Sequence, residues 1–207
     1  MRKPTVLAIA SLAAGLLAPG AAQAHLVVTG MGPLYDGVTH FALSPEDSLP
    51  VLALALYAGL RGPAHSRLLL ATLPAAWFVG GLAMSLLGLT LPAILLPSAT
   101  AVILLANGGL LAANAELSPR LCALAALGLG LIRGAADLSG IQASSGAILN
   151  LAGMSACVFV LFALAASITL PLRRFWMIVA TRVAGSWIAA VGLLLAGWIM
   201  RYGARVQ

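Results

Sequence analysis

The sequence predicts an all-α integral membrane protein with about six transmembrane helices after a cleavable signal peptide. Of the 207 residues, 62% are hydrophobic and only 8% are charged, which leaves too few polar groups to cover a water-soluble globule of this size. The apolar stretches are long and continuous rather than alternating, so helices are favoured over a β-barrel. Lipid is therefore the expected solvent for most of the chain.

The basic residues follow a pattern typical of membrane proteins. The formal net charge is +6, yet the arginines stand singly or in one pair near the ends of apolar runs, with no basic stripe of interleaved aromatic residues. This pattern argues against nucleic-acid binding. Cys122 and Cys157 lie inside apolar runs without a CxxC motif, so we expect two small buried hydrophobes and no disulfide.

The first 24 residues have the three parts of a secretory signal peptide. Arg2-Lys3 is the positive region, Thr5 to Leu17 is the apolar region, and Ala22-Gln23-Ala24 precedes the cleavage point. We therefore expect 1–24 to be removed. The mature chain, 25–207, is then one helical membrane domain, multi-pass in the bacterial inner (cytoplasmic) membrane, with a periplasmic N-terminus.

Six apolar runs approach or exceed the ~20 residues that a membrane helix needs. We expect spans near 46–61, 67–89, 91–115, 119–139, 146–170 and 175–200. Segment 31–44 is too polar and too brief to span, yet too apolar for an ordinary loop. We expect it to be a re-entrant or interfacial element.

The arginines test the orientation of these spans. With the N-terminus outside, the arginines that fall in inside connections are Arg61, Arg67, Arg120, Arg173 and Arg174. The outside connections near 90 and 140 carry no lysine or arginine, which is the asymmetry that the positive-inside rule predicts. Arg201 and Arg205 at the outer C-terminus run against it, and an odd number of spans would remove that conflict.

A cluster of ionisable residues lies at the start of the first expected span, where each buried charge costs about 2.5–3.5 kcal/mol or more. Asp36 and His40 are four residues apart, so on a helix they share a face. Glu46 and Asp47 follow Ser44-Pro45, a helix-start signal. Carboxylates and an imidazole are suitable ligands for Ni²⁺, Co²⁺ or Zn²⁺.

Each member of this cluster also has a plainer interpretation. Asp36 and His40 can form a partnered polar contact at the membrane interface. Glu46 and Asp47 can be N-terminal helix charges that the helix dipole favours. His25, the first residue after the predicted cleavage point, can chelate a metal through its α-amine and imidazole, or it is merely the residue that follows that point.

Further polar residues lie within the later spans. Arg133 and Asp137 are at positions i and i+4 of the fourth expected span, so they can neutralise each other as a structural ion pair. Asn107, Asn114 and Glu116 belong to the third expected span. Glu116 sits near the inner face, where water can solvate it.

Two stretches of the chain carry a family resemblance. They are Gly32-Pro33-Leu34-Tyr35-Asp36-Gly37-Val38-Thr39-His40, followed by Pro45-Glu46-Asp47-Ser48-Leu49, and Arg182-Val183-Ala184-Gly185-Ser186-Trp187-Ile188-Ala189-Ala190-Val191-Gly192. Together with the signal peptide and the six spans, they resemble the HupE/UreJ family of hydrogenase and urease accessory membrane proteins. The resemblance implies a permease-like protein that handles nickel or cobalt, with nickel-enzyme maturation proteins as partners and no tightly bound cofactor.

The chain departs from this family at its most diagnostic positions. His40 matches the first histidine of the family motif, but the following Asp-His pair reads Glu46-Asp47 here. A later His-Gly motif corresponds to Arg133-Gly134, and the asparagine after it corresponds to Asp137. Arginine cannot ligate a metal, so a site of carboxylates and one imidazole would be harder and less selective for nickel.

The leading hypothesis is therefore a permease or accessory protein for a divalent metal. The alternative is a non-transporting membrane scaffold or assembly factor that has lost its metal site. The chain has no G-x-x-x-x-G-K-[ST] motif, so transport would be coupled to an ion gradient or to a partner. It also has no HExxH or GxSxG motif, so we do not expect an enzyme.

Overall fold

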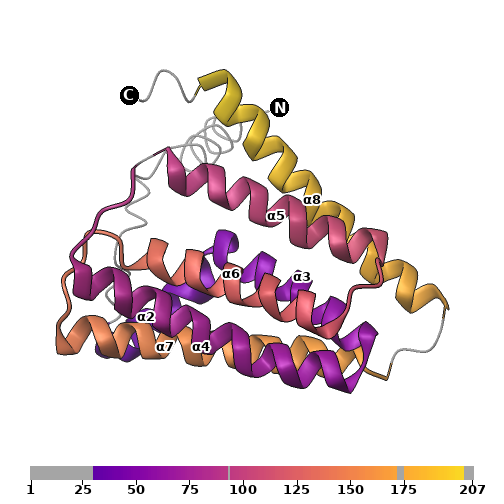
Figure 1. Ribbon diagram of the computed structural model, residues 1–207, viewed down its shortest axis with the longest axis horizontal. Coiled ribbons are helices and arrows are strands. Elements are labelled where there is room, and N and C mark those ends of the chain that lie inside the picture. The colour runs from indigo at the N-terminus through magenta and orange to yellow at the C-terminus, as the bar shows by residue number, and fades with distance from the viewer. Residues whose placement is uncertain (1–29, 93, 172–174, 203–207) are drawn as a thin grey trace, which may run out of the picture.

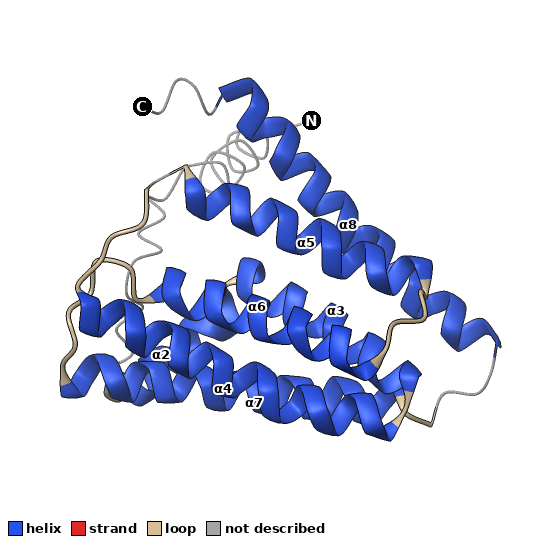
Figure 2. Ribbon diagram, viewed as in Figure 1, coloured by secondary structure: helices blue, strands red, loops and turns tan. Residues whose placement is uncertain are grey.

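The computed structural model describes residues 30–92, 94–171 and 175–202, and this part of the chain is helical without strands (Figures 1 and 2). Its helices are α2 (Pro33–Leu43), α3 (Pro45–Arg61), α4 (Pro63–Leu87), α5 (Leu95–Ala113), α6 (Pro119–Asp137), α7 (Ser145–Thr169) and α8 (Phe175–Tyr202). The prediction of an all-α membrane protein is confirmed. The predicted signal peptide and His25 lie outside the described residues.

Five of the described helices, α4 to α8, are long and apolar enough to cross a membrane. The helix at the first expected span, α3, differs from them. It has 17 residues, with Glu46 and Asp47 in its first turn and Arg61 in its last. Its apolar residues are mostly fully buried, and it contacts α2, α4, α5, α7 and α8. Because protein rather than lipid surrounds α3, its short length and its charges are tolerated.

Segment 31–44, expected to be a re-entrant or interfacial element, forms α2. This helix packs along α7, with Gly37 against the backbone of Asn150. Further along, Gly59 of α3 packs against Ala166 of the same α7. From Gly37 to Gly59 the contacts move along α7 in the same direction, from Asn150 to Ala166. The helices α2 and α3 are therefore two segments of one broken helix beside α7.

The break between α2 and α3 follows from local sequence. Pro45 is the first residue of α3, and Ser44 before it is extended, with φ −96° and ψ 99°. Proline has no N–H to donate to the preceding turn, and its ring disfavours the helical conformation in the residue before it. One helix therefore ends at Leu43 and a new one begins two residues later.

The remaining helices form two groups (Figure 1). In one, α4 and α6 pack closely, with Gly134 against the backbone of Trp77. In the other, α5 and α8 are antiparallel partners, with Gly108 near Gly185 and Gly192 near Leu105. Glycines allow such close approach between helices in lipid. The α5–α8 pair meets the rest of the bundle chiefly through α3.

The ends of the third expected span are corrected. The helix begins at Leu95 instead of residue 91, and it ends at Ala113, because Asn114 adopts a left-handed conformation with φ 50°. Such a residue commonly terminates a helix. Asn114 and Glu116 therefore lie in the connection to α6, beside Arg61 at the end of α3. We call this end of the bundle the basic end, and the opposite end, where α2 begins, the α2 end.

Candidate functional site

The break in the helix places the start of α3 inside the bundle. Asp47, in the first turn of α3, is 1% exposed. Fourteen residues separate it from Arg61 at the basic end, which corresponds to about 21 Å of helix. With Arg61 at one surface of a hydrocarbon layer of about 30 Å, this carboxylate lies within the layer. A buried charge at that depth requires partners.

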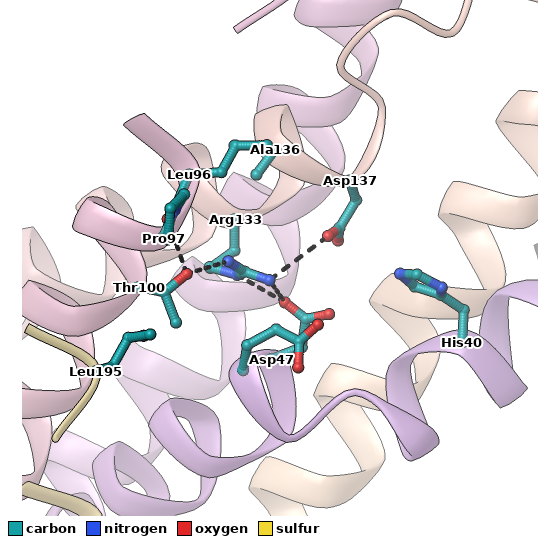
Figure 3. A pocket seen from close by; sticks show the side chains of 10 residues that line it. His40, Asp47, Leu96, Pro97, Thr100, Arg133, Ala136, Asp137 and Leu195 are labelled. Carbon is teal, nitrogen blue, oxygen red and sulfur yellow. Dashed lines mark hydrogen bonds and ion pairs between the residues drawn. The ribbon is translucent and has the colours of Figure 1, made fainter. Parts of the chain in front are cut away.

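The main partner of Asp47 is Arg133 of α6. Arg133 Nε donates a hydrogen bond of 2.6 Å to Asp47 Oδ1, and Nη2 donates to the same oxygen. Arg133 Nη1 donates to Thr100 Oγ1 of α5 at 3.0 Å. A second carboxylate, Asp137, lies 3.8 Å from Nη2. Figure 3 shows the guanidinium between the two carboxylates.

Asp137 is held in place from the opposite side. Trp77 Nε1 of α4 donates to Asp137 Oδ2 at 3.0 Å. Trp77 is fully buried and packs edge-on against Phe41 of α2, with 5.6 Å between ring centroids. The side chain of Asp137 is 4% exposed. Its position is therefore set by a rigid aromatic pair as well as by Arg133.

Three potential metal ligands converge beside this ion pair. One ligand atom each from His40, Asp47 and Asp137 lies within 4.8 Å of the others. Ligands that bind one ion tetrahedrally at about 2.1 Å are ~3.4 Å apart, so the three ligand atoms would move inward to share an ion. Asp47 Oδ2 is buried and has no hydrogen-bond partner among the described residues. An unpartnered buried carboxylate oxygen is a free ligand position.

The cluster lines a cavity of about 430 Å³. The side chains around it come from α2, α3, α5, α6 and α8, and they are His40, Glu46, Asp47, Leu96, Pro97, Thr100, Arg133, Ala136, Asp137 and Leu195. Both helix groups contribute to its wall. A relative movement of the α5–α8 pair would therefore change the shape of the cavity.

Comparison with known proteins agrees with this architecture. A family model described as HupE / UreJ protein matches residues 12–195. The chain belongs to the HupE/UreJ family. The resemblance predicted from the two sequence stretches is thus confirmed, whereas no curated protein and no solved structure matches the chain.

In this HupE/UreJ protein, the candidate metal ligands of the sequence separate into two places. His40, Glu46 and Asp47 all line the large cavity. Asp36, one turn before His40, lines a separate cavity of about 240 Å³ near Asn150 at the α2 end. The structure also brings Asp137 to the ligand cluster, where the sequence suggested only a partner for Arg133.

The other predicted polar residues lie away from the cluster. Asn107 is buried and donates to the carbonyl of Ile103, in its own helix, at 3.0 Å. Asn114 accepts hydrogen bonds from Arg61 through its backbone and side-chain oxygens. Glu116 is 92% exposed and lies 3.6 Å from Arg61, as expected for a solvated group. Thr100 was not predicted, because a lone threonine in an apolar run gives no signal.

A second group of polar residues lies at the basic end and contacts the connection between α5 and α6. Tyr57 Oη donates to Ala115 O at 2.7 Å and accepts from Leu117 N at 3.2 Å. His65 Nε2 lies 3.1 Å from Leu117 O. Tyr57, Arg61 and His65, which we call the loop clamp, fasten the connection between α5 and α6 to α3 and α4.

Proposed function

We propose that this HupE/UreJ protein is a permease, or a metal-handling accessory protein, for a divalent transition metal ion such as nickel or cobalt, and that it supports the maturation of nickel enzymes. The convergence of His40, Asp47 and Asp137 on one cavity carries the proposal. Ionisable groups at membrane depth are costly, and they ordinarily mark the path of an ion or a proton.

The ligands of the cluster are suited to reversible binding of a transported metal ion. One imidazole and two carboxylates form a harder set than several imidazoles or thiolates, so they bind nickel and cobalt more weakly. The cluster also lies beside a break in a membrane helix. Broken helices place binding sites near the middle of the membrane in many transporters, where two parts of the protein can move about the site.

The distribution of charge supports a proposal for the direction of transport. Arg61, Arg67 and Arg120 lie at the basic end, so the positive-inside rule assigns this end to the cytoplasm. The α2 end then faces the periplasm, and cargo that enters there passes His40 before it reaches Asp47. We propose inward movement, driven by an ion gradient or by a partner protein.

A second function, a non-transporting scaffold, is favoured by one observation. Arg133 already neutralises Asp47 and approaches Asp137. Because Arg133 supplies a positive charge beside both carboxylates, the cluster needs no metal ion to be stable. In that case the polar residues serve only to join α3 to α6.

Calorimetry on the purified full-length protein distinguishes the two functions. We expect wild type to bind Ni²⁺ or Co²⁺, and His40→Ala to lower the affinity by about tenfold or more, as loss of even a supporting group does at metal sites. Glu116→Gln removes an exposed carboxylate outside the cavity and is the matched control. Absence of binding by wild type, or equal binding by His40→Ala, would favour the scaffold.

Uptake in cells limited for nickel and cobalt gives the matching functional test. Deletion of the gene and the His40→Ala variant should both reduce metal accumulation, whereas Glu116→Gln should not. Unchanged accumulation in the deletion strain would reject the permease.

A further inference from the structure

The geometry points to Arg133 as a tethered competitor of the metal ion, a residue that sets how tightly the site holds its cargo. This inference rests on the proposed function, because it concerns the same three ligands. The guanidinium and a divalent cation compete for the same position beside Asp47 and Asp137. The metal ion binds only when the ion pair between Arg133 and Asp47 breaks.

Arg133 occupies the carboxylate group that a metal would bind, although Asp47 Oδ2 itself has no hydrogen-bond partner among the described residues. Two of its nitrogens donate to Asp47 Oδ1, and a third contact reaches Asp137 at 3.8 Å. The side chains of Arg133, Asp47 and Asp137 are 7%, 1% and 4% exposed. Water therefore offers little screening between these groups, and a second cation beside the guanidinium would be strongly repelled.

Arg133 cannot accommodate a metal ion without moving. A guanidinium stays protonated in proteins and has no lone pair to donate. A histidine or lysine can lose its proton when a cation arrives, whereas arginine can only move. Binding of cargo must therefore be coupled to displacement of this side chain.

The cavity offers the displaced side chain of Arg133 another position. Arg133 already donates to Thr100 at 3.0 Å on the side of α5. Glu46 lines the same cavity, so the guanidinium can exchange Asp47 for another carboxylate without leaving the bundle. Departure of the metal would let Arg133 return, which favours release over tight retention.

Titration of Ni²⁺ into the detergent-solubilised full-length protein tests the competition. Arg133→Gln removes the charge, and we expect it to bind Ni²⁺ about tenfold or more tightly than wild type, within the usual range of coupling between two ligands. Arg133→Lys places a cation there that can lose its proton when the metal arrives, so we expect an affinity between those of wild type and Arg133→Gln. Arg182→Gln, which removes an arginine outside the cavity, should not change the affinity.

Equal or weaker binding by Arg133→Gln would overturn the competition. If Arg133→Gln binds no more tightly but wild type still binds Ni²⁺ through His40, the proposed function is retained. Wild type that binds no Ni²⁺, together with tight binding by Arg133→Gln, would support the competition and reject the permease. The measurements therefore distinguish failure of the competition by Arg133 from failure of the proposed metal transport.

Thermal unfolding keeps the test decisive if Arg133→Gln is unstable, because this variant leaves Asp47 buried without its partner. We expect its unfolding midpoint to fall in chelator and to rise on addition of Ni²⁺ by more than that of wild type, since a ligand stabilises the state that binds it better. A rise no larger than that of wild type would contradict the inference. The double variant Asp47→Asn with Arg133→Gln removes both charges of the closer ion pair and should lose the extra rise, because Asp47 is a ligand.

Discussion

At the scale of single residues, the decisive contact joins two charges that lie far apart in the sequence. The spacing of Arg133 and Asp137 predicted their ion pair, since residues four apart share a helix face, and the structure contains it at 3.8 Å. The closer partner, Asp47, is 86 positions away. No local pattern reveals such a contact, because it depends on where the folded bundle places α3 and α6. The sequence therefore identified the charged residues but not all of their pairings.

Asp47→Ala tests this contact. The substitution leaves the guanidinium of Arg133 buried with one distant carboxylate, and removal of one partner of a buried pair costs about 3–5 kcal/mol. We expect a clearly lower midpoint of thermal unfolding in detergent. Glu116→Gln, at an exposed position, should stay within about 0.5 kcal/mol of wild type. A midpoint for Asp47→Ala equal to that of the control would show that the pair contributes nothing to stability.

At the scale of elements, most helix ends could be predicted from the sequence. The Ser-Pro step predicted the start of α3, and the apolar runs predicted α4 to α8. The packing partner of 31–44 could not be predicted, because a short amphipathic segment does not specify which helix its few buried residues, Gly37 and Phe41, will contact. Here α7 covers it, and Gly37 permits the close approach.

Gly37→Val tests that packing. A Cβ at this position would collide with the backbone of Asn150, and overpacking of this kind costs about 1–3 kcal/mol. We expect a lower unfolding midpoint and, because α2 carries His40, weaker binding of Ni²⁺. Gly109→Val is the matched control, since nothing lies within 4 Å of its Cβ position. Equal midpoints for the two variants would contradict the close contact between α2 and α7.

The loop clamp provides a second test at this scale. Tyr57→Phe removes a hydroxyl that both donates to Ala115 and accepts from Leu117, so two backbone groups lose their partner at a cost of about 1–3 kcal/mol. The matched control is Tyr35→Phe, because Tyr35 is 53% exposed. We expect the unfolding midpoint to fall for the first variant only. Similar midpoints would show that the clamp does not hold the connection.

At the scale of the whole molecule, two helix groups enclose one polar cavity. The α5–α8 pair supplies one wall through Thr100 and Leu195, and the remaining helices supply the ligands. Composition predicted a helical membrane protein, and the distribution of arginines predicted its orientation. Neither predicted the two groups, because the glycines that pair α5 with α8 look like those at any other helix contact.

Cysteine labelling in intact cells tests the orientation. In a background with Cys122 and Cys157 replaced by alanine, Gln142→Cys at the α2 end should react with a membrane-impermeant maleimide. Glu116→Cys at the basic end should react only after the membrane is permeabilised, because the arginines keep this end in the cytoplasm. The reverse pattern would invert the proposed direction of transport.

The most direct test of the central claim is X-ray absorption spectroscopy at the nickel edge on the purified, nickel-loaded protein. His40, Asp47 and Asp137 predict a shell of light oxygen and nitrogen ligands that includes imidazole and no sulfur. The imidazole contribution should disappear in His40→Ala. A spectrum without imidazole, or one that His40→Ala leaves unchanged, would show that the ion is not held by this cluster.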